Sequence, residues 1–265
     1  MKAGCWTLAI LIFMTSCGKN VLSELGNPNS DDALLFDAKT AVDGQRYDEA
    51  ITIVTTKVST SGRTTTRAKE ILASGYAGKC GLNFVNYINS LADSSAPQIF
   101  VMVSAPFVGK VVDPASCLSS LQVLQSIGTY QTRTTNQNTF AAVVAMVLMG
   151  SATRLYTDDL PLMGNGVQDA IKISCSLTDA QIDQVILGYG YMIENYAAIS
   201  SQLGSNASVV SDAINVCGSV SCASTDPAQI TLAMRTAMRA IMNTQQYGVG
   251  DFDASDTNNL PLSCL

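Results

Sequence analysis

Apolar residues recur every three or four positions along most of this chain, and short runs rich in glycine, serine, threonine and asparagine separate them. That spacing places the apolar side chains on one face of an α-helix. Together with capping residues such as Ser30 and Asp113, it predicts an all-α fold of antiparallel helical hairpins. The expected helices cover residues 33–42, 47–58, 66–92, 114–127, 139–156, 178–203, 206–216 and 227–247.

Small residues mark the first two predicted helices. Ala38, Ala41, Gly44 and the segment 47–51 (YDEAI) resemble a tetratricopeptide repeat, a family in which two antiparallel helices pack through short side chains. Gly44 lies one position farther from Tyr47 than in the family pattern. The segment 73–77 (ASGYA) follows at about one repeat length and is similar to the start of a second repeat.

The resemblance covers residues 31–93 of a single helical domain spanning 31–265. It implies a repeat-like part there, followed by a divergent helical part over 94–265 with additional helices. The alternative is a generic antiparallel helical hairpin.

The chain begins with the pattern of an export signal. Lys2 precedes an apolar run over 6–14 (WTLAILIFM), which is too short to span a bilayer. Thr15 and Ser16 then place two small residues before Cys17. This pattern resembles the lipobox of bacterial lipoproteins, although a methionine stands where leucine is usual.

The lipobox resemblance implies a signal peptide over 1–16, a lipid such as palmitate on the sulfur of Cys17, and a lipidated tether over 17–30. The membrane would then be a partner of the chain through its anchor. The residue after the cysteine is Gly18, and in this it resembles lipoproteins that are delivered to the outer membrane, where the chain would face the periplasm. The alternative is an ordinary secretory signal with a chance cysteine.

Six cysteines remain beyond Cys5, which the signal peptide would carry away, and the lipidated Cys17. An even number in an exported chain predicts three disulfides, because the periplasm oxidises thiols. One pair is favoured, since only four residues separate its members and closing a short loop costs little entropy. That pair is Cys217–Cys222, whereas the pairing of Cys80, Cys117, Cys175 and Cys264 stays open.

Composition limits the chemistry that the chain can perform. There is no histidine, which removes histidine-based acid–base catalysis and most zinc sites, so we predict no metal and no cofactor. The formal net charge is −6, and an acidic chain without a basic patch is a poor nucleic-acid binder.

Few residues are candidates for catalysis or ligand binding. The acidic clusters Asp158–Asp159 and 251–256 lack the spacing of a calcium loop and are expected to lie in solvated loops. Arg235 and Arg239 lie one helical turn apart and either bind an anionic ligand or form a solvated face. No catalytic motif is present in the sequence.

The expected function is therefore binding, not catalysis. We predict a lipid-anchored envelope protein that holds a protein partner or a small apolar ligand on stacked helical pairs. In outline the chain resembles the periplasmic tetratricopeptide lipoproteins associated with TRAP-type transport. That resemblance implies an accessory role in transport and a small apolar or organic-acid ligand. The alternative is an envelope hydrolase that uses carboxylates.

Overall fold

A computed structural model describes residues 27–160, 163–166, 168–169 and 176–249, and all the regular structure in these ranges is helical, which confirms the all-α prediction. Cys17, Cys175 and Cys264 lie outside the described residues. The helices are α1 (Asp31–Asp43), α2 (Tyr47–Thr52, continued by a π-helical turn over Ile53–Lys57), α3 (Thr60–Arg63), α4 (Thr66–Lys79), α5 (Phe84–Ala92), α6 (Ile99–Ser104), α7 (Pro114–Gln125), α8 (Thr135–Thr157), α9 (Asp179–Asn195), α10 (Ala207–Val220) and α11 (Leu232–Met242).

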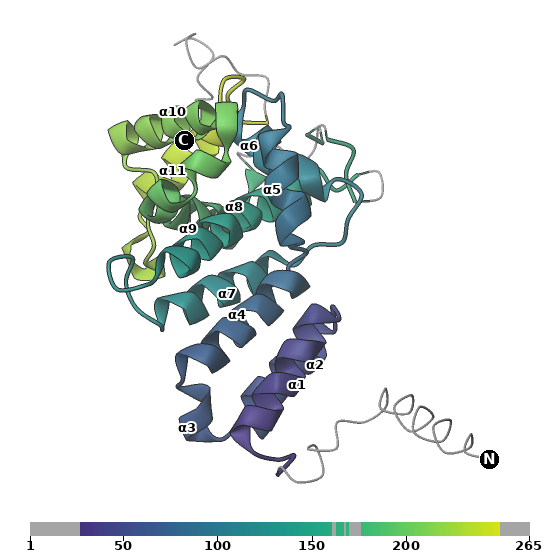
Figure 1. Ribbon diagram of the computed structural model, residues 1–265. Coiled ribbons are helices and arrows are strands. Elements are labelled where there is room, and N and C mark those ends of the chain that lie inside the picture. The colour runs from purple at the N-terminus through teal and green to yellow at the C-terminus, as the bar shows by residue number, and fades with distance from the viewer. Residues whose placement is uncertain (1–26, 161–162, 167, 170–175, 250–265) are drawn as a thin grey trace, which may run out of the picture.

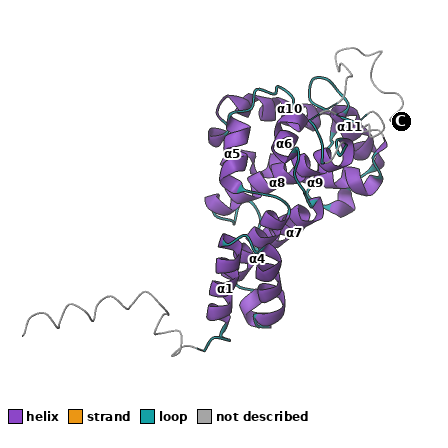
Figure 2. Ribbon diagram, turned by 90° about the vertical axis from the view of Figure 1, so that its right-hand side faces the viewer, coloured by secondary structure: helices purple, strands orange, loops and turns teal. Residues whose placement is uncertain are grey.

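The longer helices pack as successive antiparallel pairs. The pair α1–α2 lies at one end of the molecule, α4 packs against α7 in the middle, and α8 packs against α9 beyond them (Figures 1 and 2). Helices α5, α6, α10 and α11 surround the α8–α9 pair (Figure 1). The expected hairpin arrangement is therefore present, and α4 lies beside both members of the first pair.

Two clusters of apolar side chains hold this array together. The smaller one joins α1, the α2 region and α4, and it consists of Leu34, Leu35, Ala38, Ile53, Val54, Val58, Ala68 and Ile71. The larger one includes most of α8 and α9. Helix α4 contributes to both, since Ala73 and Ala77 belong to the larger cluster. Tyr87 and Leu91 of α5 also belong to the larger cluster.

Helix α8 is the centre of the larger core. Thr134 and Gln137 form a reciprocal capping box at its start, so the helix begins four residues before the expected start at 139. With 23 residues α8 is long and apolar enough to cross a membrane by length and composition. Burial against α6, α7 and α9 accounts for this composition, as in the core helix of many soluble proteins.

The long helix expected over 66–92 is wrong, because the chain turns after Cys80. Gly81 has φ +110°, and the Asn83 side chain caps α5 by accepting from the Asn86 N–H. Two other expected helices are too long: α9 ends at Asn195, where short 3₁₀ turns follow, and α11 begins only at Leu232. Apolar spacing missed the break after α4 because Cys80 and Leu82, on either side of the turn, are both buried.

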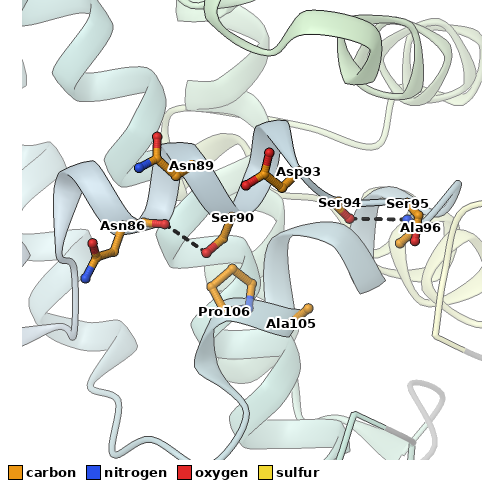
Figure 3. A pocket seen from close by; sticks show the side chains of 9 residues that line it. All are labelled: Asn86, Asn89, Ser90, Asp93, Ser94, Ser95, Ala96, Ala105 and Pro106. Carbon is orange, nitrogen blue, oxygen red and sulfur yellow. Dashed lines mark hydrogen bonds between the residues drawn. The ribbon is translucent and has the colours of Figure 1, made fainter.

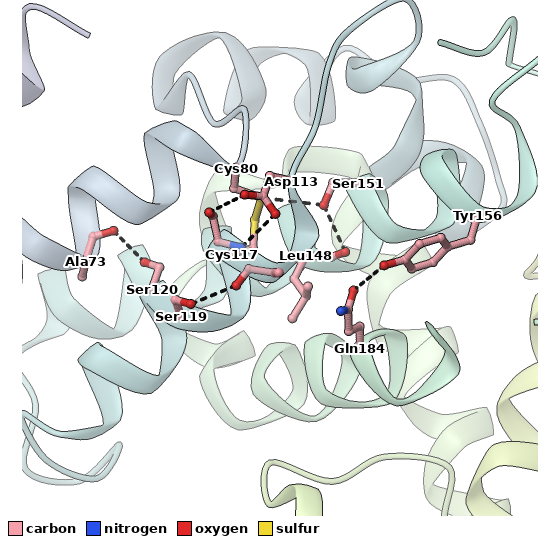
Figure 4. The surroundings of a disulfide bond; sticks show 12 residues. Ala73, Cys80, Asp113, Cys117, Ser119, Ser120, Leu148, Ser151, Tyr156 and Gln184 are labelled. Carbon is pink, nitrogen blue, oxygen red and sulfur yellow. Dashed lines mark hydrogen bonds between the residues drawn. A yellow bond between two sulfur atoms is a disulfide. The ribbon is translucent and has the colours of Figure 1, made fainter. Parts of the chain in front are cut away.

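Two disulfides lie within the described residues. The Cys80–Cys117 bond joins the end of α4 to α7, with 5.2 Å between the Cα atoms, and the Asp113 N–H donates to the Cys80 carbonyl oxygen beside it (Figure 4). The Cys217–Cys222 bond, which is the pair favoured by spacing, closes the last turn of α10. The residues between its cysteines continue the helix through Val220, although we expected a turn there.

Candidate functional site

A groove of 340 Å³ lies between α1 and α4, on the surface of the repeat-like part. Residues of α1 form one wall and residues of α4 form the other. They are Lys39, Val42 and Asp43 on α1, and Arg67, Glu70, Ile71 and Ser74 on α4. The volume is within the range of roughly 300–1,000 Å³ that is usual for ligand-binding clefts.

Helical spacing explains why these side chains gather. Asp32, Phe36, Lys39 and Asp43 are three or four residues apart, so they share one face of α1. Val42 and Ile71 provide the apolar part of the groove, and Ile71 also packs into the smaller core cluster. Phe36, on this same face of α1, is 63% exposed. The groove thus combines apolar contact surface with a charged rim.

The rim charges are paired within the chain. Lys39 Nζ lies 2.6 Å from Asp43 Oδ2, and Arg67 Nη1 lies 3.2 Å from Asp32 Oδ1. The Glu70 carboxylate accepts a 2.8 Å hydrogen bond from the side-chain amide of Gln137 on α8. Both cations of the groove therefore already face a carboxylate, so this arrangement favours an apolar ligand segment over an organic acid.

The candidate arginines of the last helix do not form a ligand site. The Arg235 guanidinium makes a two-pronged ion pair with Asp183 on α9, at 2.7 and 2.8 Å. Arg239 donates to Asp179 Oδ1 at 2.9 Å and to the Leu177 carbonyl oxygen at 2.8 Å. These contacts fasten α11 to α9, so neither the solvated face nor the anion site that we weighed is correct.

The carboxylates with shifted pKa values do not resemble catalytic acids. A hydrogen bond from Ser59 lowers the pKa of Asp31, and the hydrogen bond from Arg239 lowers that of Asp179. A carboxylic acid that acts as a general acid near neutral pH needs a raised pKa, whereas both of these pKa values are lowered. Asp158 is only 6% exposed, and its carboxylate accepts the backbone N–H groups of Asn165 and Gly166 at 3.0 and 2.8 Å. It therefore holds the loop after α8 and is not the solvated residue that we expected.

No metal-binding cluster of acidic or cysteine side chains occurs in the part of the chain that the structure describes.

The shifted pKa of Asp179 predicts a pH-dependent contribution to stability. The folded state holds this carboxylate below its ordinary pKa of 3.8, so the stabilisation is complete above that pH and is lost as the pH falls through the lower folded value. We expect Asp179→Asn to lower the urea midpoint at pH 6 and to differ less from the parent protein at pH 3. A gap between the two proteins that is equal at both pH values would contradict this assignment.

The sequence does not predict most of the groove residues as a site, because mixed charged and apolar residues also occur on ordinary amphipathic surface helices. The available signal was Phe36, an aromatic residue on the polar side of the first predicted helix. The sequence-predicted cysteines that are described form disulfides remote from the groove, and the described acidic residues Asp158 and Asp159 follow α8.

Comparison with protein-family models, with curated proteins and with solved structures gives no match for this chain. The function is therefore argued from the residues of the groove and from the sequence features at the start of the chain.

Proposed function

We propose that this chain is a lipid-anchored binding or scaffold protein of the bacterial envelope. In this proposal its α1–α4 groove holds an apolar segment of a protein partner. The observation that carries the proposal is the groove itself, where Val42 and Ile71 lie between charges that are already paired. Phe36 is exposed one helical turn before the groove residue Lys39. An aromatic side chain at an apolar cleft is a common energetic centre of protein interfaces.

The compartment rests on the lipobox-like pattern that ends at Cys17. In this proposal the lipid holds the chain at the outer membrane, and the residues before α1 give the body reach into the periplasm. The resemblance to tetratricopeptide lipoproteins of TRAP-type transport supports an accessory role in transport. The pairing of Lys39 and Arg67 with carboxylates favours an apolar ligand over an organic acid. The carboxylate-dependent hydrolase remains the alternative, and the directions of the pKa shifts at Asp31 and Asp179 disfavour it.

The anchor has a direct test. Replacing Cys17 with serine removes the sulfur that would carry the lipid, and a single acyl chain already gives measurable membrane affinity. We expect Cys17→Ser to move the protein from the membrane fraction to the soluble fraction of the envelope. Equal membrane association of the variant and the parent would contradict lipid anchoring at this position.

The groove is tested by capture of partners from solubilised envelopes of the bacterium that produces the protein. Val42→Glu places a charge in the apolar part of the groove, and desolvating that charge on binding is unfavourable. We expect the yield of the specific partner to fall by about tenfold, which corresponds to about 1.4 kcal/mol of binding free energy.

Val85→Glu is the matched control, because Val85 is 65% exposed on α5 and does not line the groove. The control should capture the partner as well as the parent protein does. Equal losses in both variants, or no loss in Val42→Glu, would contradict the proposal. Hydrolysis of an envelope component that survives Val42→Glu would favour the alternative function.

A further inference from the structure

A second, larger cavity of 720 Å³, which is shallow and broadly open to solvent, lies between α5 and the 3₁₀ turn that follows α6 (Figure 3). It is separate from the α1–α4 groove and shares no residue with it. Its lining consists of Asn86, Asn89, Ser90, Asp93, Ser94, Ser95, Ala96, Ala105 and Pro106. Asn86, Ser90 and Asp93 recur at steps of four and three, so they form one stripe of α5, while Tyr87 and Leu91 on another face are buried.

The lining is rich in groups that both donate and accept hydrogen bonds. Side-chain amides and hydroxyls make up more than half of it, and Asp93 provides the single carboxylate. The side chains of Asn86, Asn89, Asp93 and Ser95 have no hydrogen-bond partner among the described residues, so their donors and acceptors are available to a ligand. Ser90 lies opposite Pro106, whose ring provides a small apolar wall (Figure 3).

The wall of this cavity is held in place before any ligand arrives. Asn206, which is only 7% exposed, donates its side-chain amide to the carbonyl oxygens of Leu91, Ala92 and Ser94 at 2.7, 3.3 and 3.0 Å. These carbonyl groups lie at the end of α5 and just beyond it, where the helix leaves most carbonyl oxygens without an intrahelical donor. The Tyr87 hydroxyl also donates to the Val103 carbonyl oxygen on α6 at 3.3 Å. These bonds hold the backbone at the end of α5 and its packing against α6, and this backbone carries the lining side chains.

The chemistry of the lining excludes several ligand classes. None of its nine residues is a cation, so phosphate and carboxylate groups would meet Asp93 without a compensating charge. None is aromatic, so a nucleobase would have no ring on which to stack. The apolar residues of the lining are two alanines and one proline, so no large aliphatic side chain is present to bind a mainly hydrophobic ligand. A neutral ligand with many hydroxyl groups satisfies all of these conditions.

We propose that this cavity is a binding site for a neutral saccharide. The amides and the Asp93 carboxylate would pair with sugar hydroxyls, and Pro106 would contact a C–H face of a ring.

Isothermal titration of the purified full chain tests the site with neutral probes, namely cellobiose, maltose and N,N′-diacetylchitobiose. We expect at least one of the three to bind with millimolar or tighter affinity, and gluconate, a polyol with a carboxylate, not to bind. The double variant Asn86→Leu/Asn89→Leu should weaken binding at least tenfold. Asn215→Leu, at an exposed asparagine on α10 outside the cavity, should leave it unchanged.

Circular dichroism should show the same helicity for both leucine variants, because all three asparagines are exposed. Sedimentation with isolated cell-wall glycan distinguishes the source, since co-sedimentation of the parent but not the double variant indicates a wall polymer. Absence of co-sedimentation with retained probe binding indicates a free oligosaccharide. No binding of any neutral probe, or equal binding by the double variant, would overturn the proposal. Val42→Glu should bind the probes normally, so a failure of the groove proposal is separable from a failure here.

Discussion

Replacing Cys80 and Cys117 together with alanine is expected to lower the free energy of unfolding by about 4 kcal/mol, from the loop-closure entropy of the 37-residue separation. The bond joins the end of α4 to α7 and so ties the two central helices of the array. Without it the unfolded chain gains freedom while the folded chain loses a fully buried contact. Chemical denaturation of the double variant and the parent protein measures the difference.

The second disulfide provides the matched control. Cys217 and Cys222 are only five positions apart, so the same relation gives about 2 kcal/mol for Cys217→Ala/Cys222→Ala. All four cysteines are buried, so the loss of packed sulfur is similar in both variants. The account is contradicted if the two double variants are equally stable, or if removing the short bridge has the larger effect.

Gly150→Ala is expected to destabilise the fold by about 3 kcal/mol, at the upper end of the range for overpacked cores. Gly150 lies in α8 where that helix meets α6, and a Cβ atom there would overlap the carbonyl group of Val103. Because the obstacle is the backbone of α6 and not a flexible side chain, the two helices would have to move apart. Thermal or urea unfolding of the variant measures the effect.

Gly218→Ala is the same substitution at a position where the added methyl group should not lower the free energy of unfolding. Gly218 lies in α10, and a Cβ atom there would meet no atom within 4 Å. Alanine is the better helix former by about 1 kcal/mol, so this variant should be as stable as the parent protein or more stable. Destabilisation by both substitutions would show that Gly150 is not a special point of close helix contact.

The sequence predicts the helical class well, because apolar spacing and capping residues depend on local chemistry. Ser30, Asp113 and Thr178 cap helices as expected. The turn at Gly81 and the short helix α6 were missed, since both lie among buried residues whose spacing does not distinguish a helix from a tight turn.

The sites could be predicted only in part. Short sequence separation favoured Cys217–Cys222, whereas Cys80 and Cys117 meet only because α4 and α7 pack together. The groove requires two helices from different hairpins, so no local pattern reveals it. The ion pairs of Arg235 and Arg239 likewise depend on how α11 lies against α9.

The central claim is that the groove beside Phe36 holds a protein partner in the envelope. The most direct measurement incorporates a photo-crosslinking phenylalanine analogue at position 36 of the full chain in the cells that produce it, and at the exposed position 85 as a control. The account predicts a discrete crosslinked partner from position 36 that is absent from position 85 and is lost when Val42→Glu is added. No adduct from position 36, or the same adducts from both positions, would contradict it.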